Sequence, residues 1–210
     1  MTGQPVDLDN WPRTATYRLF RAFERPHYQI TARIDVSALM TVRSDPDVSV
    51  YRRTLHAIGT GLHDVPELRM RFRGDEVMIY DRLILSSTVP MDSGAFRFSY
   101  IPYDPDPVAF DTAARDELTK VKAGHPRDAN DGSIADIAYL SCLPWLDYTA
   151  LDNAMPHADD CIPRVSWGKI VPKGRGFDMA MTLLVHHALV DGRQAARFFE
   201  ATQAALGDIT

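Results

Sequence analysis

Hydrophobic and polar residues alternate in several short segments of the chain, as they do in half-buried β-strands. Residues 30–36 are one such segment, because Ile30, Ala32, Ile34 and Val36 fall on one face of an extended chain. Strand-like patterns also occur in residues 83–89, 96–101, 136–143, 163–170 and 177–186.

A hairpin is predicted between two of the extended segments. Leu68, Met70 and Phe72 alternate with arginines, and the Gly74-Asp75 pair that follows is a typical turn dipeptide. A second short run with apolar residues continues after the turn, so we expect two antiparallel strands here.

Three segments have helical spacing. In residues 44–62, Asp45 is a candidate cap and Pro46 suits a first turn. The apolar positions of this segment are Val48, Tyr51, Leu55, Ile58 and Leu62.

The second helix is predicted over residues 103–125, with Asp106 as the cap, Pro107 in the first turn and Gly124 at the end. The third is predicted from Gly192 to about Leu206. Its core-facing positions are Ala195, Phe198, Phe199, Thr202 and Leu206, and Gly207 can end it.

Strands and helices alternate too regularly for a domain boundary to be placed. We therefore expect one domain over residues 1–210, of the α/β class, with a mixed sheet of roughly six to eight strands and helices packed on it.

Composition and charge exclude several classes of function. The net charge is −5 and no basic block is present, which argues against a nucleic-acid partner. The first fourteen residues lack the basic and apolar regions of a secretory signal, and the longest apolar run, residues 179–185, is too short to span a membrane. The only two cysteines, Cys142 and Cys161, have neither metal-site nor disulfide spacing. We therefore expect a cytoplasmic protein with no membrane partner.

Two adjacent histidines end the last apolar strand, and an Asp-Gly pair follows shortly after them. His186 and His187 would point to opposite faces of a strand, so they cannot both bind one ion, and no metal site is predicted. One of them could simply be a hydrogen-bonded core residue. A neutral imidazole at the end of an apolar strand is also suited to act as a general base. Asp191 and Gly192 could then hold the turn beside it.

The sequence "HHALVDG" resembles the His-His-x-x-x-Asp-Gly signature of chloramphenicol acetyltransferases. Related coenzyme-A-dependent acyltransferases and peptide-synthetase condensation domains share this signature. "NWPRTATYRLF", "TARIDVSAL", "FRFSYIPYDPDPVAF", "LSCLPWLDYTAL" and "PRVSWGKI" resemble further blocks of the chloramphenicol acetyltransferases, in the same order and over nearly the whole chain. The length also resembles the free-standing enzymes, because condensation domains are about twice as long.

The resemblance implies catalytic roles for two residues. His187 matches the base that takes a proton from an acceptor hydroxyl, which then attacks the thioester of acetyl-CoA directly. Ser141 matches the serine that donates a hydrogen bond to the oxyanion. By itself Ser141 could also be a buried strand serine bonded to the backbone. Arg13 and Asp191 match a structural ion pair, and this is compatible with Asp191 as a helix cap.

Other positions match residues that contact the two substrates. Lys169 matches a lysine near the coenzyme A phosphates, and Trp145 matches a tryptophan beside the active-site tunnel, although core packing is an equal alternative for Trp145. Ser166 stands where the family usually has threonine, near the acceptor. The candidate acceptor-pocket aromatics are Phe20, Phe96 and Tyr100.

The implied fold is a two-layer α/β sandwich that assembles as a homotrimer. Its active sites lie between subunits, so that His187 of one subunit faces the acceptor pocket of its neighbour. The first functional hypothesis is transfer of acetyl from acetyl-CoA to the primary hydroxyl of chloramphenicol, without a metal. Trp167 and Ile170 depart from the family pattern, which keeps open a different alcohol or amine acceptor, or a longer acyl donor. A non-catalytic trimeric protein that sequesters a ligand is the third hypothesis.

Overall fold

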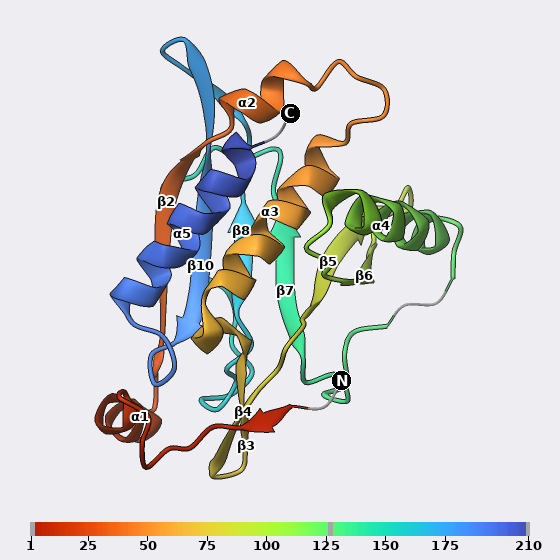
Figure 1. Cartoon of the computed structure of the whole chain (residues 1–210). Helices are drawn as coiled ribbons and strands as arrows, with labels where there is room; N and C mark the ends of the chain where they lie inside the picture. The colour runs from red at the N-terminus through yellow and green to blue at the C-terminus, as the bar shows by residue number, and fades with distance from the viewer. Residues whose placement is uncertain (1–2, 126–127, 209–210) are drawn as a thin grey trace.

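The computed structural model describes residues 3–125 and 128–208 (Figure 1). The helices are α1 (Thr14–Arg21), α2 (Ser37–Thr41), α3 (Val50–Asp64), α4 (Pro107–Lys122), α5 (Gly192–Gly207) and the short 3₁₀ helix η1 (Pro66–Arg69). The strands are β1 (Gln4–Pro5), β2 (His27–Asp35), β3 (Met70–Arg73), β4 (Glu76–Ile79), β5 (Ile84–Pro90), β6 (Phe96–Pro102), β7 (Ile137–Cys142), β8 (Arg164–Trp167), β9 (Val171–Lys173) and β10 (Gly176–His186). Every helix of this part of the chain is too short or too polar to cross a bilayer.

A seven-stranded sheet carries most of the strands, in the order β2-β10-β8-β7-β5-β6, with β9 pairing to the start of β10. Strand β10 is antiparallel to β2, β8 and β9, whereas β7 is parallel to both β5 and β8. The prediction of a large mixed sheet is therefore confirmed. The prediction that residues 1–210 form a single domain stays a prediction, and the terminal residues 1–2 and 209–210 lie outside the described residues.

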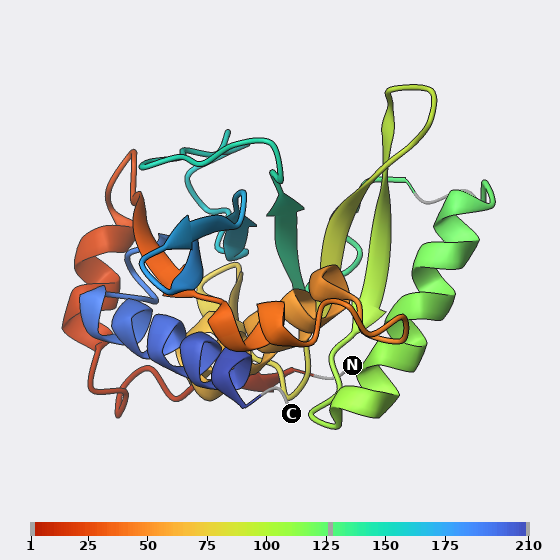
Figure 2. The ribbon, with the colours of Figure 1, turned by 90° about the horizontal axis from the view of Figure 1, so that it is seen from above.

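The helices α3, α4 and α5 lie on one face of the sheet, which gives the predicted two layers (Figures 1 and 2). Alternate residues of β10, namely Met179, Met181, Leu183 and Val185, belong to the core cluster on that side. The opposite face is covered by the long connection between β7 and β8, residues 143–163, which arches over the sheet in Figure 2. The sheet thus has one face packed on helices and one face under a loop.

The second predicted helix is confirmed, and the first begins later than expected. Asp106 caps α4 and accepts a hydrogen bond from the Val108 N–H at 2.9 Å. Helix α3 begins at Val50, and its cap is Ser49, not Asp45. Asp45 instead accepts hydrogen bonds from the Asp47 and Val48 N–H groups and stabilises a turn before the helix. Helices α1 and α2 were not predicted, because neither has a side chain that caps its first turn.

The predicted hairpin is present, but it forms a separate small sheet. Strands β3 and β4 pair so that Arg73 lies opposite Glu76, and Gly74 occupies the turn with φ +63°. Strand β1 adds to β4 and completes a three-stranded sheet. The predicted strand over residues 163–170 is regular only in β8, because the chain turns after Trp167 and re-enters the sheet as β9.

Arg71, one of the arginines that alternate with apolar residues in β3, is buried and only 3% exposed. Its Nη1 donates to the carbonyl oxygens of Leu68 at 3.0 Å and Met70 at 2.6 Å, its Nε donates to that of Ala135 at 3.1 Å, and its Nη2 donates to that of Ile137. The guanidinium therefore joins the small sheet to the beginning of β7.

Replacing Arg71 is expected to destabilise the fold. Arg71→Met removes several charge-assisted hydrogen bonds and leaves buried carbonyls without a donor, so we expect the free energy of unfolding to fall by about 3 kcal/mol. Arg73 on the same hairpin is exposed, and Arg73→Met is expected to change stability by less than about 0.5 kcal/mol. Urea titrations of both variants measure the difference, and equal effects would contradict the assigned role of Arg71.

His63 in α3 is held in the neutral form by its surroundings. Its Nδ1–H donates to the Gly59 carbonyl at 2.7 Å, and its Nε2 accepts from the Leu83 N–H at 3.2 Å. Burial lowers the pKa of His63 to about 4 from the ordinary 6.5. The unfolded chain therefore binds a proton at a higher pH than the folded one, and stability is lost as the pH falls from 6.5 towards 4.

We expect His63 alone to reduce the free energy of unfolding by about 2 kcal/mol between pH 7.5 and pH 5. His63→Gln keeps one donor and one acceptor but does not titrate, so its stability should depend less steeply on pH in this window. Thermal or urea unfolding at several pH values tests this, and an unchanged slope in the variant would show that other groups control it.

Candidate active site

The two adjacent histidines lie at the end of β10, the longest strand of the sheet, which pairs with β2 on one side and with β8 and β9 on the other. His186 is 2% exposed, and its ring contacts the rings of His27 and Phe72 edge-on, at 5.1 and 4.8 Å between centroids. Its Nδ1 accepts a hydrogen bond from the Ala188 N–H at 3.1 Å. Burial, followed by the nearby His27, lowers the pKa of His186 to about 4. His186 is therefore a neutral core residue that fixes the start of the turn.

His187 has a different environment, because it is only partly buried. Its backbone N–H donates to the Pro26 carbonyl at 2.9 Å. Its ring stacks on Phe20 of α1 with centroids 3.7 Å apart, and the ring of Tyr28 tilts against it at 4.6 Å. Its Nδ1 is buried and has no hydrogen-bond partner among the described residues. Aromatic packing thus orients the imidazole while part of it remains accessible.

The turn after His187 is fixed by the beginning of α5. Asp191 is the N-cap of this helix and accepts from the Arg193 N–H at 2.9 Å, while Gln194 accepts from the Asp191 N–H at 3.2 Å. The other carboxylate oxygen of Asp191 accepts from Arg13, whose side chain is 11% exposed. Partial burial alone would raise the pKa of Asp191, but the Arg193 N–H and Arg13 together hold it below its ordinary value. The N-terminal segment is therefore tied to the turn that carries His187.

Ser141 lies near the end of β7 and lines a cleft of about 920 Å³. Trp145 and Phe96 line the same cleft and are 69% and 60% exposed. Their exposure leaves both rings available to a ligand, and it excludes the alternative that Trp145 packs in the core. The cleft therefore brings together Ser141, Trp145 and Phe96, which the sequence analysis assigned to the oxyanion, the active-site tunnel and the acceptor pocket.

Helices α3 and α4 supply the other wall of this cleft, which sequence reasoning missed. Arg52, Arg115 and Lys122 line it, and Asp111 pairs with Arg52 at 2.7 Å and with Arg115 at 3.1 Å. Arg115, Leu118, Thr119 and Lys122 recur at helical spacing, so the sequence of α4 did contain the signal for a partly basic face. Lys169 is exposed but does not line the cleft.

The segment that follows Ser141 is hydrogen-bonded to β8 and to the residues just after it. The Leu143 N–H donates to the Trp167 carbonyl at 2.8 Å, the Lys169 N–H donates to the Leu146 carbonyl at 2.7 Å, and the Tyr148 hydroxyl donates to the Ser166 carbonyl at 2.8 Å. Ser166 itself is 2% exposed beneath this segment.

Within one chain, His187 and Ser141 do not share a site. Ser141 is in register with Ser166 and, through it, with Thr182 of β10, and His187 lies five residues beyond Thr182. At about 3.3 Å per residue and 4.8 Å per strand, the two residues are separated by roughly 19 Å. Their faces differ too, because His187 packs with Tyr28 on the helical side and Ser141 lies on the loop-covered side.

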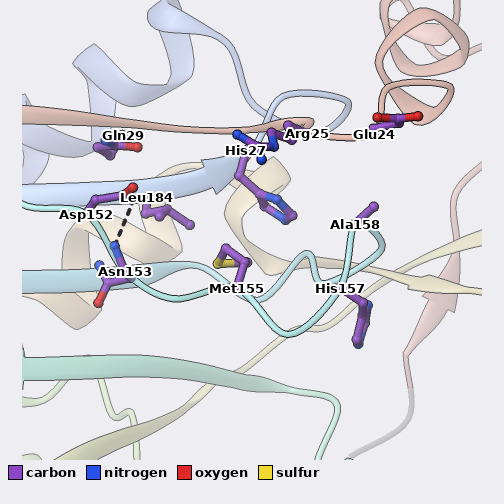
Figure 3. A pocket seen from close by; sticks show the side chains of 10 residues that line it. All are labelled: Glu24, Arg25, His27, Gln29, Asp152, Asn153, Met155, His157, Ala158 and Leu184. Carbon is purple, nitrogen blue, oxygen red and sulfur yellow. Dashed lines mark hydrogen bonds between the residues drawn. The ribbon is translucent and has the colours of Figure 1, made fainter.

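A smaller pocket of about 390 Å³ lies on the loop-covered face, between β2 and residues 152–158 (Figure 3). Leu184 of β10 and Met155 of the loop are apolar lining residues, and His27, Gln29, Asp152 and Asn153 provide polar groups. The Nδ2 of Asn153 is buried and has no hydrogen-bond partner among the described residues. None of these residues was singled out from the sequence.

Neither cysteine is suited to act as a nucleophile. Burial raises the pKa of Cys142 to about 11 and also raises that of Cys161, so both remain thiols. Across residues 3–125 and 128–208, no three His, Cys, Asp or Glu side chains gather as metal ligands would.

Comparison with known proteins gives one family. The family model described as chloramphenicol acetyltransferase matches residues 1–203. Chloramphenicol acetyltransferase 2 of Escherichia coli is 25% identical, with 94% of each chain covered, and the chloramphenicol acetyltransferase of Streptomyces acrimycini is 27% identical, with 99% of this chain and 96% of the relative covered. A solved chloramphenicol acetyltransferase structure superposes with a TM-score of 0.86 over 98% of this chain and 100% of that chain, at 23% identity, and so establishes the fold.

Proposed function

Because the chain belongs to the chloramphenicol acetyltransferase family, we propose that it transfers the acetyl group of acetyl-CoA to the primary hydroxyl of chloramphenicol. The protein is an acetyl-CoA-dependent acyltransferase, and acetyl-CoA is the co-substrate of the family. The match of the family model to residues 1–203 is the observation that carries the proposal, and the names of the relatives support chloramphenicol as the acceptor.

His187 is the general base of the proposed reaction. Its neutral imidazole takes the proton of the acceptor hydroxyl while the oxygen attacks the thioester carbonyl. The carbonyl π electrons move to the oxygen, and the Ser141 hydroxyl donates a hydrogen bond to the resulting oxyanion. When the tetrahedral intermediate collapses, the C–S bond breaks and the leaving sulfur takes the proton from the imidazolium. Acetyl therefore passes directly between the substrates and no acyl-enzyme forms.

A second copy of the chain completes the site. His187 and Ser141 are separated by roughly 19 Å and lie on opposite faces, so one subunit cannot bring His187 to the acceptor hydroxyl and Ser141 to the carbonyl oxygen that this hydroxyl attacks. In the proposed homotrimer, His187 of one subunit faces the Ser141 cleft of the next. Large exposed apolar side chains flank both halves: Leu19 and Phe23 lie on either side of Phe20 in the sequence, and Trp145 and Leu146 follow Ser141. Such patches favour association.

The cleft beside Ser141 is the proposed coenzyme A site. Trp145 offers an exposed ring for packing, and Arg52, Arg115 and Lys122 give the wall positive charge. Lys169 is exposed on the connection between β8 and β9, where it can approach a phosphate without lining the cleft.

A different alcohol or amine acceptor is the second candidate, and the polar lining of the smaller pocket favours it. The departure of Trp167 from the family pattern does not support a different acceptor, because its side chain is only 3% exposed and packs in the core. Ile170 is partly buried against the same core. Neither departure from the family pattern lines the two cavities described above.

The proposed activity is tested by following thiol release from acetyl-CoA with chloramphenicol and identifying the product. The expected result is stoichiometric release of CoA and formation of an ester at the primary hydroxyl. Binding of chloramphenicol without consumption of acetyl-CoA would overturn the proposal and favour a sequestering protein. Turnover of other alcohols with no ester of chloramphenicol would favour the second candidate.

A further inference from the structure

We infer that Arg33 is a positioning residue for coenzyme A, because its ion pairs fix the Trp145 wall of the cleft and the connection that carries Lys169 on the sheet. Arg33 does not itself line the cleft, so it acts through the residues that it holds. The inference rests on the proposed function, because it concerns the donor site of the same reaction.

Arg33 bridges two carboxylates from different parts of the chain. It lies on β2, diagonal to Asp178 on the neighbouring strand β10, and its Nη2 donates to the Asp178 carboxylate. Its Nη1 donates to Asp147 at 2.5 Å, and Asp147 lies in the connection between β7 and β8, two residues after Trp145. One guanidinium therefore ties the cleft wall to the edge of the sheet.

Asp178 extends this network to β9. Its side chain is only 5% exposed, and it also accepts from the Lys173 Nζ at 3.0 Å. The hydrogen bond from Arg33 holds the pKa of Asp178 below its ordinary value, so this buried carboxylate is charged at neutral pH. Lys173 belongs to the strand that follows Lys169, and the network therefore reaches both parts of the proposed donor site.

The segment that carries Trp145 packs closely on the residues that lead from β8 to β9. A Cβ atom on Gly168 would lie 2.6 Å from the Leu146 carbonyl oxygen and 3.0 Å from the Tyr148 ring, so this approach requires a glycine. The Trp145 and Leu146 side chains are exposed and do not anchor the segment. Its side-chain anchors are the next two residues, Asp147 through Arg33 and Tyr148 through the Ser166 carbonyl.

The charge of Asp147 provides a test in which the sign of the effect decides. Coenzyme A is a polyanion, so removal of a nearby carboxylate would strengthen its binding if only long-range electrostatics mattered. The positioning role predicts the opposite, because Asp147→Asn breaks the ion pair that fixes the Trp145 wall. We expect the affinity for coenzyme A, measured by calorimetric titration, to fall by about two- to fivefold, which is typical of a partly exposed ion pair. The KM for acetyl-CoA should rise by a similar factor, while kcat changes by less than about twofold.

Asp64→Asn is the matched control. Asp64 pairs with Arg197 at 2.6 Å, and its side chain is 41% exposed, against 46% for Asp147. It lies at the last residue of α3, whereas the first turn of this helix lines the cleft. The affinity for coenzyme A should therefore stay at the wild-type value. A loss equal to that of Asp147→Asn would overturn the inference.

A second pair of variants tests whether Asp147 acts through Arg33. Arg33→Met should weaken the binding of coenzyme A at least as much as Asp147→Asn does. In the Arg33→Met background, Asp147→Asn should cause no further loss, because its partner is already absent. Losses that multiply in the double variant would contradict the role of the pair, and the sign of the Asp147→Asn effect decides alone if Arg33→Met does not fold.

The outcomes separate this inference from the proposed function. If Asp147→Asn binds coenzyme A as tightly as the wild type, or more tightly, the inference is overturned whether or not chloramphenicol is acetylated. If its affinity falls but the wild type forms no ester of chloramphenicol, the positioning role stands and the proposed acceptor fails. If the wild type does not bind coenzyme A, the inference and the proposed donor site both fail.

Discussion

Replacement of His187 by glutamine is expected to leave the fold intact and to lower kcat by about 10²- to 10⁴-fold, the usual contribution of a general base. Glutamine keeps the approximate size of the side chain and its contact with Phe20, but it cannot take the hydroxyl proton. The acceptor hydroxyl then has to attack in its protonated form. The KM values should change little, because the imidazole acts mainly in the transition state.

The neighbouring histidine provides the control for this prediction. His186 is buried and its Nδ1 accepts from the Ala188 N–H. His186→Gln should therefore lower the midpoint of thermal unfolding, while its kcat should fall far less than the kcat of His187→Gln. Thiol-release kinetics and thermal unfolding of both variants give the comparison. Turnover by His187→Gln above a tenth of the wild-type rate would show that another group takes the proton.

Ser141→Ala is expected to lower kcat by about 10²- to 10³-fold, as the loss of one oxyanion donor does in other acyl transfers. Ser141 lines the cleft beside Trp145, and its removal creates only a small void in a site that is already open. Stability and KM should therefore remain near the wild-type values. The loss is expected in kcat because the negative charge on the carbonyl oxygen, which Ser141 stabilises, develops in the transition state.

The hydroxyl itself can be tested by a conservative change. Ser141→Thr keeps the donor and adds one methyl group at a half-buried position, so it should retain at least about tenfold more activity than Ser141→Ala. Equal losses in the two variants would mean that Ser141 acts through packing and not as a donor.

Local chemistry explains which helices the sequence could predict. In α4, Asp106 and Pro107 mark the start without ambiguity. Before α3, both Asp45 and Ser49 have the chemistry of a cap, and only the packing of the following residues decides for Ser49. Arg71 is a further case, because a guanidinium that binds four backbone carbonyls from separate segments has no signature in its own strand.

In the candidate site, too, local features could be predicted from the sequence and features that depend on long-range packing could not. The turn between His187 and Asp191 is local, so a short motif indicated it. The separation of His187 from Ser141 depends on the order of β10, β8 and β7 in the sheet, which hydrophobic periodicity does not encode. The smaller pocket was missed for a similar reason, since Gln29, Asn153 and Leu184 come from three distant segments that only the fold brings together.

Mixed oligomers test the central claim, that each active site combines His187 of one subunit with the Ser141 cleft of another. His187→Gln and Ser141→Ala chains, each nearly inactive, are co-refolded in equal amounts and assayed by thiol release. In a cyclic trimer with random assembly, about a quarter of the sites combine an intact His187 from one chain with an intact Ser141 from the next, so about a quarter of the wild-type activity should return. His187→Gln chains mixed with the double variant should gain nothing. If the two single variants together are no more active than the sum of the separate preparations, the shared site is contradicted.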